Sequence, residues 1–504
     1  MIKLIYRIES DYMSKKRMLI VTSVTLSVVT ISLGIVKLYQ TYALSNYIGT
    51  VTDTGIDVYI NDDSYASIPA NGSSNVYYML TNTNPGTVKY GVAYQTTSGV
   101  TVKVYDTSED PATGTIEEND KKYIKLHLEN KNSTNKTIEL STVLGYENGG
   151  DLVVPSGVTL VTDTYTPPPT AAEYITKLYT TASKTTVTNN SITYNTAPSV
   201  SLMNDRLGGT TTDLDGGNIR YYGANPNNYI YFNCSDYSNQ TSSTCETWRI
   251  IGVFDGKLKL IKNENIGTFS WDNKDTSTGA ENDAGKNDWT TARLMKLLNP
   301  SNYYKVDSND NNLGQSLYYN SASGKCYSGQ NNATVDCDFT STGIKNDITR
   351  NMIAETTYNL GGWNSNTVYP NLMYEKERGT TVYTGRPTTP WTGKIALAYT
   401  SDYGYAADLN QCKDKTLYDY NNSTCTSNNW MKAIITNNGS NTGWLLTPNS
   451  GSSYNAWFVS SDGYVYNYYR AYFAFGAVPV LSLSSELGIE SGDGSESNPY
   501  KLNA

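Results

Sequence analysis

The chain has 504 residues, which is too long for one hydrophobic core, so two or three domains are expected. The net charge is −9 and no cluster of Lys or Arg follows the N-terminus, which argues against the phosphate-binding surface of a nucleic-acid-binding protein. The 44 Tyr and 8 Trp residues can supply burial, so the low charge content does not indicate disorder. The excess of Tyr over Phe has two readings, a drift in base composition or an exposed, hydrated binding surface.

Residues 1–44 are interpreted as a basic cytoplasmic tail followed by a membrane anchor or signal. Residues 19–36 carry no charge, and a helix of that length spans about 27 Å, close to the ~30 Å hydrocarbon core of a bilayer. Lys15, Lys16 and Arg17 precede this stretch, so the positive-inside rule places the N-terminus in the cytoplasm and the rest of the chain outside. The predicted localisation is the cell membrane, with a single pass and an extracellular bulk.

Cleavage of this segment is the alternative. Ala43 and Ser45 each end a short run with small residues at the positions that a signal peptidase reads, and a cleaved chain would be secreted. Both readings export everything that follows.

Residues 45–163 contain neither Cys nor Trp and predict an immunoglobulin-like β-sandwich that serves as a stalk. Seven short stretches alternate apolar and polar residues between turn clusters, as in such sandwiches. They begin at residues 57, 75, 88, 100, 123, 137 and 157. His127, the single histidine of the chain, falls on a strand, where a packed or solvated side chain is expected rather than a catalytic base.

A linker is predicted at residues 164–170, which read TYTPPPT, because three successive prolines favour a stiff segment. The remaining residues, 171–504, hold every Cys and Trp and form the predicted head. The cysteines fall in three local pairs spaced by 11, 11 and 13 residues, namely Cys234 with Cys245, Cys326 with Cys337, and Cys412 with Cys425. Each pair is predicted to form a disulfide worth about 3 kcal/mol. Zinc binding is disfavoured, because zinc ligands in such motifs lie about two to four residues apart.

The head is expected to combine a few helices with many short strands. Helices are predicted at 171–179, at 287–300 and at 343–362, the second capped by Asn287 or Asp288. The third helix would place four residues on one apolar face, namely Ile344, Ile348, Met352 and Ile353.

Two Asp-Gly dipeptides in the head predict tight hairpins. Asp255-Gly256 separates WRIIGVF from KLKLIK, and Asp462-Gly463 separates NAWFVSS from YVYNYY. Asp-Gly suits a two-residue type I′ turn. Both hairpins are therefore expected to have two-residue loops.

Four motifs resemble, in this order, a family of exported proteins of gut-type Gram-positive bacteria. They are WRIIGVF from Trp248, NDW with LLN between Asp288 and Asn299, WLLTP from Trp444, and G-x-x-P-V-L-S-L from Gly476. The family is built on a domain of unknown function that is similar to the C-type-lectin-like fold of formylglycine-generating enzymes and variable receptor-binding proteins. The resemblance covers roughly residues 245–483 and implies a C-type-lectin-like α+β head.

The closing motif departs from the family pattern Gly-Val-Arg-Pro-Val. The stretch here is Gly476-Ala477-Val478-Pro479-Val480, so Val478 stands at the arginine position. The role of that arginine is either absent or taken by another residue such as Arg470. The resemblance therefore implies a fold and not an activity.

Enzyme activity has little support in the sequence. A catalytic triad would have to recruit His127 across domains, and six cysteines in local pairs do not supply reactive thiols. Carboxylates are plentiful, so a glycosidase pair stays open, but no spacing singles out two of them. The chain is therefore expected to lack catalytic residues.

No cofactor or metal is expected, with calcium as the lesser alternative. The stretches TDLDGGN at 212 and DSNDNNLG at 307 are rich in oxygen ligands. The second fails the EF-hand pattern because Asn312 occupies the glycine position. Both stretches are read as turns.

The hairpin at 455–470 carries the candidate ligand-binding residues. A two-residue turn at Asp462-Gly463 would pair Ser461 with Tyr464, Val459 with Tyr466, and Trp457 with Tyr468, all on one side of the ribbon. Ala456, Phe458 and Val465 would face the core. The open side would then present the proposed contact set, which is Trp457, Tyr464, Tyr466, Tyr468 and Arg470. The opposite reading, in which the tyrosine side is the core, also fits the pattern.

The sequence favours a cell-surface adhesion or ligand-binding protein that recognises an extracellular glycan, peptide or host protein non-covalently. A structural cell-surface or filament subunit is the alternative, and an extracellular hydrolase is the third reading.

Overall fold

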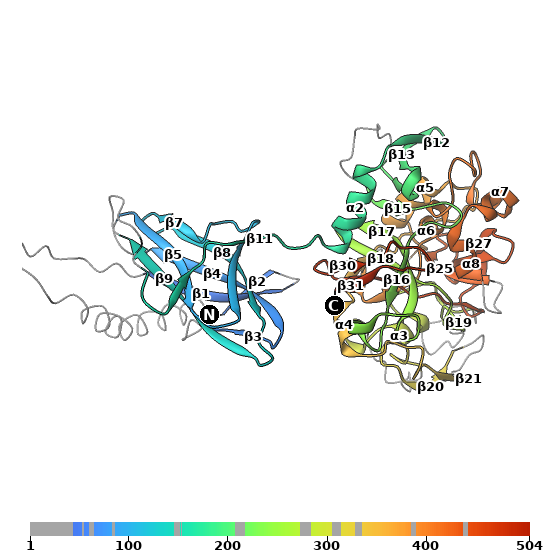
Figure 1. The fold of residues 1–504 in the computed structure, drawn as a ribbon. Coiled ribbons are helices and arrows are strands. Elements are labelled where there is room, and N and C mark those ends of the chain that lie inside the picture. Colours follow the sequence, from blue (N-terminus) through green and yellow to red (C-terminus); the bar gives the residue numbers. More distant parts are fainter. Residues whose placement is uncertain are drawn as a thin grey trace, which may run out of the picture. The chain divides into compact units, whose positions relative to one another are not determined.

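The structure, a computed structural model, describes residues 44–503 apart from 53–54, 60–64, 83–85, 146–151, 153, 207–216, 273–283, 305–313, 328–334, 385–389 and 437–441. It divides into two compact units, Met1–Pro167 and Pro168–Ala504, within the proline stretch (Figure 1). The predicted membrane segment at 19–36 lies outside the described residues. Within them, none of the helices is both long and apolar enough to cross a membrane.

The first unit consists of β-strands in two sheets. One has the order β11-β6-β8-β4-β1-β2, and the other has the order β10-β5-β9-β3 with β7 beside β5. The strands are β1 (Leu44–Thr52), β2 (Gly55–Tyr59), β3 (Tyr65–Ile68), β4 (Gly72–Asn82), β5 (Val88–Gln95), β6 (Val100–Tyr105), β7 (Thr113–Ile116), β8 (Lys121–Asn130), β9 (Lys136–Gly145), β10 (Val158–Leu160) and β11 (Thr164–Tyr165). All seven predicted strands are present, and β1, β3, β7 and β11 are additional.

The two sheets share one core. Leu126 and Leu128 of β8 are buried in the same cluster as Ile138 and Leu140 of β9, which belongs to the other sheet. Alternate residues of these strands point to opposite faces, so the period-two pattern buries one face of each sheet. The prediction of two packed sheets is confirmed.

His127 occupies the predicted strand position in β8 and is buried. Its Nδ1 lies 2.7 Å from Asn75 Oδ1, and its ring stacks on Tyr165 with centroids 3.6 Å apart. Burial lowers the pKa of His127, although the charge of Glu129 acts in the opposite sense. The contacts give His127 a packing role at the start of the linker. Among the described residues, no group of His, Cys, Asp and Glu could hold a metal ion.

The second unit combines several sheets with short helices (Figure 1). Its strands are β12 (Thr185–Asn189), β13 (Ile192–Ala197), β14 (Leu202–Asn204), β15 (Ile219–Tyr221), β16 (Tyr229–Phe232), β17 (Glu246–Phe254), β18 (Lys257–Lys262), β19 (Thr268–Ser270), β20 (Ser323–Cys326), β21 (Val335–Asp338), β22 (Thr356–Tyr358), β23 (Trp391–Gly393), β24 (Ile395–Ala396), β25 (Thr442–Pro448), β26 (Asn455–Ser460), β27 (Val465–Arg470), β28 (Ala474–Gly476), β29 (Val480–Ser482), β30 (Gly488–Ser491) and β31 (Lys501–Asn503). A nine-stranded sheet contains β17 and β18, and a five-stranded sheet has the order β19-β28-β25-β26-β27.

The helices of this unit are short. They are α2 (Ala171–Thr181), α3 (Arg293–Leu298), α4 (Asp347–Met352), α5 (Pro370–Arg378), α6 (Thr400–Tyr405), α7 (Ser423–Ser427), α8 (Trp430–Thr436) and the 3-10 turns η1 (Pro198–Val200), η2 (Tyr237–Asn239), η4 (Ser301–Tyr303) and η5 (Leu417–Asn421). The helix predicted at 171–179 is α2, which starts with a capping box between Thr170 and Glu173. The prediction of a mostly β fold with three disulfides is confirmed, because Cys234–Cys245, Cys326–Cys337 and Cys412–Cys425 are bonded.

Two predicted helices are shorter than expected. The helix at 287–300 begins only at Arg293, and Asn287 instead donates from Nδ2 to the carbonyl oxygens of Asn449, Ser452 and Asn455. These bonds fix Asn287 outside the helix. The N-cap position is Ala292, so neither Asn287 nor Asp288 caps α3 and the predicted cap is wrong.

The helix predicted at 343–362 is reduced to α4, and β22 follows it. Asn346 caps α4 by accepting from Thr349 N, which starts the helix late. Ile348, predicted on the apolar face, is 56% exposed, whereas Ile344, Met352 and Ile353 are buried. The β-branched Thr356 and Thr357 favour the strand that ends the helical stretch.

Candidate functional site: a tyrosine stripe and a buried charge network

The hairpin that carries the predicted contact residues lies at the edge of the five-stranded sheet. In the described part of the chain, β27 pairs with β26 on one side and ends the strand order. Val459 pairs with Val465, and Phe458 pairs with Tyr466. The predicted pairs of Ser461 with Tyr464 and of Val459 with Tyr466 are therefore wrong by one residue.

The turn explains the shifted register. A type I′ turn requires positive φ at both loop residues, and Gly463 has φ 96° whereas Asp462 is not among the residues of positive φ. The Ser460 N–H donates to Tyr464 O over 2.9 Å, which leaves a three-residue loop. Asp462 accepts from the hydroxyl of Ser460 instead of entering the left-handed region.

Trp457 is not on the open side of the ribbon. Its side chain is fully buried, and its indole N–H donates to the Trp363 carbonyl oxygen over 3.0 Å. Trp457 and Val459 pack in one core cluster, whereas Ala456 and Phe458 pack in another. Both faces of β26 are covered, so the prediction of Trp457 as a contact residue is wrong. The predicted burial of Ala456, Phe458 and Val465 is confirmed.

The three predicted tyrosines lie next to one another, with Tyr464 just before β27 and Tyr466 and Tyr468 within it. Tyr464 and Tyr466 are half-buried, and Tyr468 is 53% exposed. Their ring centroids are 5.0 Å apart in each successive pair. The Phe458 ring lies beneath, 5.7 Å from Tyr466 and 5.6 Å from Tyr468. The row is therefore supported by the core and open to solvent at its outer side.

A fourth tyrosine joins this row from a distant part of the sequence. Tyr418 of η5 is 40% exposed, and its ring centroid lies 5.4 Å from that of Tyr464 and 5.7 Å from that of Tyr466. We call Tyr418, Tyr464, Tyr466 and Tyr468 the tyrosine stripe. Tyr418 was not among the predicted contact residues, although its position inside the predicted Cys412–Cys425 loop could have indicated it.

Within the stripe, Tyr464 and Tyr466 stack on each other. The planes of Tyr464 and Tyr466 differ by only 22° at a centroid distance of 5.0 Å, so each covers a face of the other. Burial, followed by the neighbouring phenols and Asp462, raises the pKa of Tyr466 to about 12. The Tyr466 phenol thus stays neutral at physiological pH and can donate and accept hydrogen bonds.

Arg470 ends β27 and is exposed. Its guanidinium lies 5.7 Å from the centre of the Tyr454 ring, away from the stripe rings. A register shift separates the pair Ala456–Tyr469 from the pair Phe458–Tyr466, so β27 carries a bulge before Arg470. Val478, which stands at the arginine position of the resembled family, is buried in the second core cluster.

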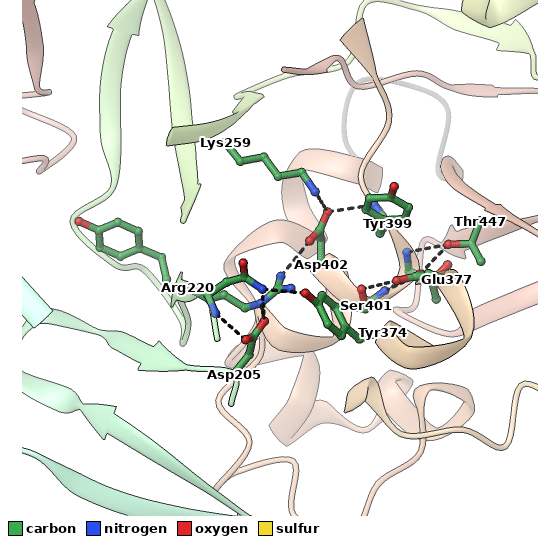
Figure 2. A network of polar contacts seen from close by, with 12 residues as sticks. Asp205, Arg220, Lys259, Tyr374, Glu377, Tyr399, Ser401, Asp402 and Thr447 are labelled. Carbon is green, nitrogen blue, oxygen red and sulfur yellow. Dashed lines mark hydrogen bonds and ion pairs between the residues drawn. The ribbon is translucent and has the colours of Figure 1, made fainter. Parts of the chain in front are cut away.

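A second polar feature is a buried charge network around Asp402 (Figure 2). Arg220 of β15 donates from Nε to Asp205 Oδ2 over 2.6 Å and from Nη1 to Asp402 Oδ1 over 2.8 Å. Lys259 of β18 pairs with the other oxygen of Asp402. Burial opposes ionisation of Asp402, but the charges of Lys259 and Arg220 outweigh it and lower its pKa to about 2. The network joins strands β15 and β18 to helix α6.

Glu377 of α5 extends this polar interior. It accepts from Ser401 N over 3.0 Å and from the Thr447 hydroxyl over 2.7 Å, and burial raises its pKa (Figure 2). Both Glu377 and Asp402 are buried and held by their neighbours. Their closed surroundings fit a structural role better than the open carboxylate pair that a hydrolase needs.

Two hollows in the described part of the second unit are small. One lined by Trp271, Trp289 and Tyr383 has about 20 Å³, close to what one water molecule occupies. No stripe residue lines this hollow or the smaller one beside Arg293. Small organic ligands usually bind in enclosed sites of several hundred Å³, so the stripe suits a larger partner.

Neither a family model nor a curated protein matches the chain.

Proposed function

We propose that this chain is an exported cell-surface protein whose second unit binds an extracellular macromolecule through the tyrosine stripe. The single observation that carries this proposal is the row of four adjoining, partly exposed tyrosines on an edge strand and a disulfide-closed loop. Tyrosine is enriched at protein interfaces because it offers a large contact area with little rotamer entropy to lose.

A protein or peptide ligand fits the stripe better than a single sugar. Sugar rings stack on open aromatic faces, whereas Tyr464 and Tyr466 each cover one face of the other. A row of adjoining rings suits a partner that contacts several rings at once. The stripe would then act like the tyrosine-rich contact surface of a binding domain.

The remaining parts of the proposal rest on the sequence. Residues 1–44 would anchor the chain in the membrane or direct its export. The first unit would be an immunoglobulin-like stalk, and the second unit would have a C-type-lectin-like fold. The local disulfides support an oxidising, extracellular location.

Binding by purified full-length chain to an array of extracellular proteins and glycans tests the proposal. The chain should bind at least one protein on the array, and the triple variant Tyr464→Ser, Tyr466→Ser, Tyr468→Ser should lose that binding by at least about tenfold. Tyr65→Ser is the matched control, because Tyr65 is 43% exposed but lies in the first unit.

The triple variant Tyr464→Phe, Tyr466→Phe, Tyr468→Phe removes the hydroxyls but keeps the rings and their packing. It is therefore the variant to measure if the serine variant fails to fold. If both triple variants fold and bind as well as the wild type, the proposal is wrong.

A further inference from the structure

We infer that the tyrosine stripe receives an arginine side chain of the partner, seated between the stripe rings and Asp462. This inference rests on the proposed function and names the chemistry of the partner. The stripe resembles the places where the fold holds its own arginines.

The fold holds two of its arginines with tyrosine rings and carboxylates together. The Arg220 guanidinium lies 5.3 Å from the centre of the Tyr374 ring and pairs with Asp205 and Asp402. Arg378 lies 3.4 Å from the centre of the same ring and 3.7 Å from Glu377. An aromatic ring attracts a cation through its quadrupole, and a carboxylate adds a directional hydrogen bond.

The stripe supplies the same two groups at the surface. Asp462 is exposed and lies in the turn directly before Tyr464. It accepts from the Ser460 hydroxyl and the Tyr464 N–H, and no Lys or Arg in the described part of the chain forms an ion pair with it. Tyrosine rings and a carboxylate therefore stand together without a cation of this chain between them.

The local field has the sign that a cation requires. Burial is the main cause that raises the pKa of Tyr466 and Tyr468, and the negative charge of Asp462 acts in the same direction on both. Arg470 lies at the opposite end of β27, over Tyr454. The stripe thus has an acidic end at Asp462 and a basic end at Arg470, which would orient a partner segment.

Arginine fits better than lysine because its planar guanidinium can lie on a ring and bond a carboxylate at the same time. Tyr418 and Tyr468 have the largest exposed fractions in the stripe; Tyr418 lies beside Tyr464 and Tyr466, and Tyr468 lies beside Tyr466. An exposed cation–π contact is weak, so a measurable effect requires several rings and the carboxylate together.

The test uses purified full-length chain and a fluorescein-labelled peptide of alternating glycine and arginine, read by fluorescence anisotropy. Matched peptides carry lysine or citrulline, which has the shape of arginine without its charge, at the same positions. The arginine peptide should bind at least about fivefold more tightly than the citrulline peptide and more tightly than the lysine peptide. Asp462→Asn and Tyr468→Ser should each remove most of that difference.

Asp338→Asn is the matched control, because Asp338 is also exposed and also accepts from a nearby hydroxyl and backbone N–H, those of Thr340. It should leave the arginine preference unchanged. Equal affinity for the arginine and citrulline peptides, or an arginine preference that survives Asp462→Asn, would overturn the inference.

The two proposals can fail separately. If the array ligand depends on the stripe tyrosines but arginine and citrulline peptides bind alike, the proposed function stands and the arginine preference falls. If the arginine peptide binds at the stripe but no extracellular protein does, the proposed function falls instead.

Discussion

The buried charge network and the tyrosine stripe contain the same kinds of side chain in opposite surroundings. Around Asp402, buried carboxylates pair with buried Arg220 and Lys259. On β27, tyrosines and Asp462 stand at the surface. Enclosure makes the first set costly to disturb, because a buried charge that loses its partner is poorly solvated. Exposure should make the second set tolerant of substitution without loss of stability. Under the proposed function, substitution there should weaken binding.

The largest effect is expected at the buried network. Asp402→Asn leaves Lys259 and Arg220 buried without their shared counter-charge, so the second unit should lose roughly 3–5 kcal/mol of unfolding free energy. All eight Trp residues lie in this unit, so urea unfolding followed by Trp fluorescence reports on it alone. Asp338→Asn, at an exposed aspartate, should change the midpoint little, and an equal loss in both variants would contradict the comparison.

Acid should have the next largest effect on the unfolding free energy of the second unit. The pKa of Asp402 is lowered to about 2, so its ionised form contributes stability that is present above the ordinary value of 3.8 and is lost as the pH falls toward 2. The loss should be about 2 kcal/mol in total. Urea midpoints measured by Trp fluorescence between pH 5 and pH 2 test this, with Asp402→Asn expected to show a flatter profile over that range. A profile unchanged by the substitution would show that Asp402 is not the group responsible.

The two glycines of the Asp-Gly turns should differ in their tolerance of a side chain. Both have positive φ, so Ala costs about 1 kcal/mol at either position. A Cβ on Gly256 would meet nothing within 4 Å, whereas one on Gly463 would lie 2.6 Å from Thr426 Cγ2 and 3.1 Å from Tyr420 O. Thermal unfolding of Gly463→Ala should therefore show the larger loss, about 2 kcal/mol. Equal losses in the two variants would mean that the packing around Gly463 relaxes at no cost.

The smallest stability effect is expected at the exposed end of the stripe. Tyr468 is 53% exposed, so Tyr468→Ser should cost about 1 kcal/mol or less of unfolding free energy. The same substitution should weaken binding of the array ligand by about tenfold. Measuring both quantities on one preparation separates the two roles. A loss of several kcal/mol would show that this ring belongs to the core.

Features that depend on nearby residues were predictable from the sequence. The disulfides link cysteines that close short loops, and the hairpin at Asp255-Gly256 follows from a dipeptide that accepts positive φ at both positions, 49° and 72°. The second Asp-Gly turn differs, because Asp462 does not adopt positive φ and its side chain accepts from the Ser460 hydroxyl. A turn dipeptide therefore predicts the position of a hairpin loop more reliably than it predicts the pairing register of the two strands.

Contacts between distant residues were not predictable. Arg220 and Asp402 are 182 positions apart, and no periodicity relates them. The burial of Trp457 depends on a second core cluster that covers the other face of β26, which one strand's alternation does not reveal. Tyr418 joins the stripe only because the chain folds η5 against β27. Tyr464, Tyr466 and Tyr468 could be grouped from the sequence because they alternate along one arm of a hairpin.

The attachment of Tyr418 has a consequence for how the protein can change over generations. Leu417 and Tyr420 on either side of it are buried, and the buried Cys412–Cys425 bond closes the loop around them. The backbone is thus held by neighbours of Tyr418 and not by Tyr418 itself. Under the proposed function, mutation at this one projecting position can alter what the surface recognises while the anchoring residues keep the loop in place, so recognition can diversify faster than the fold.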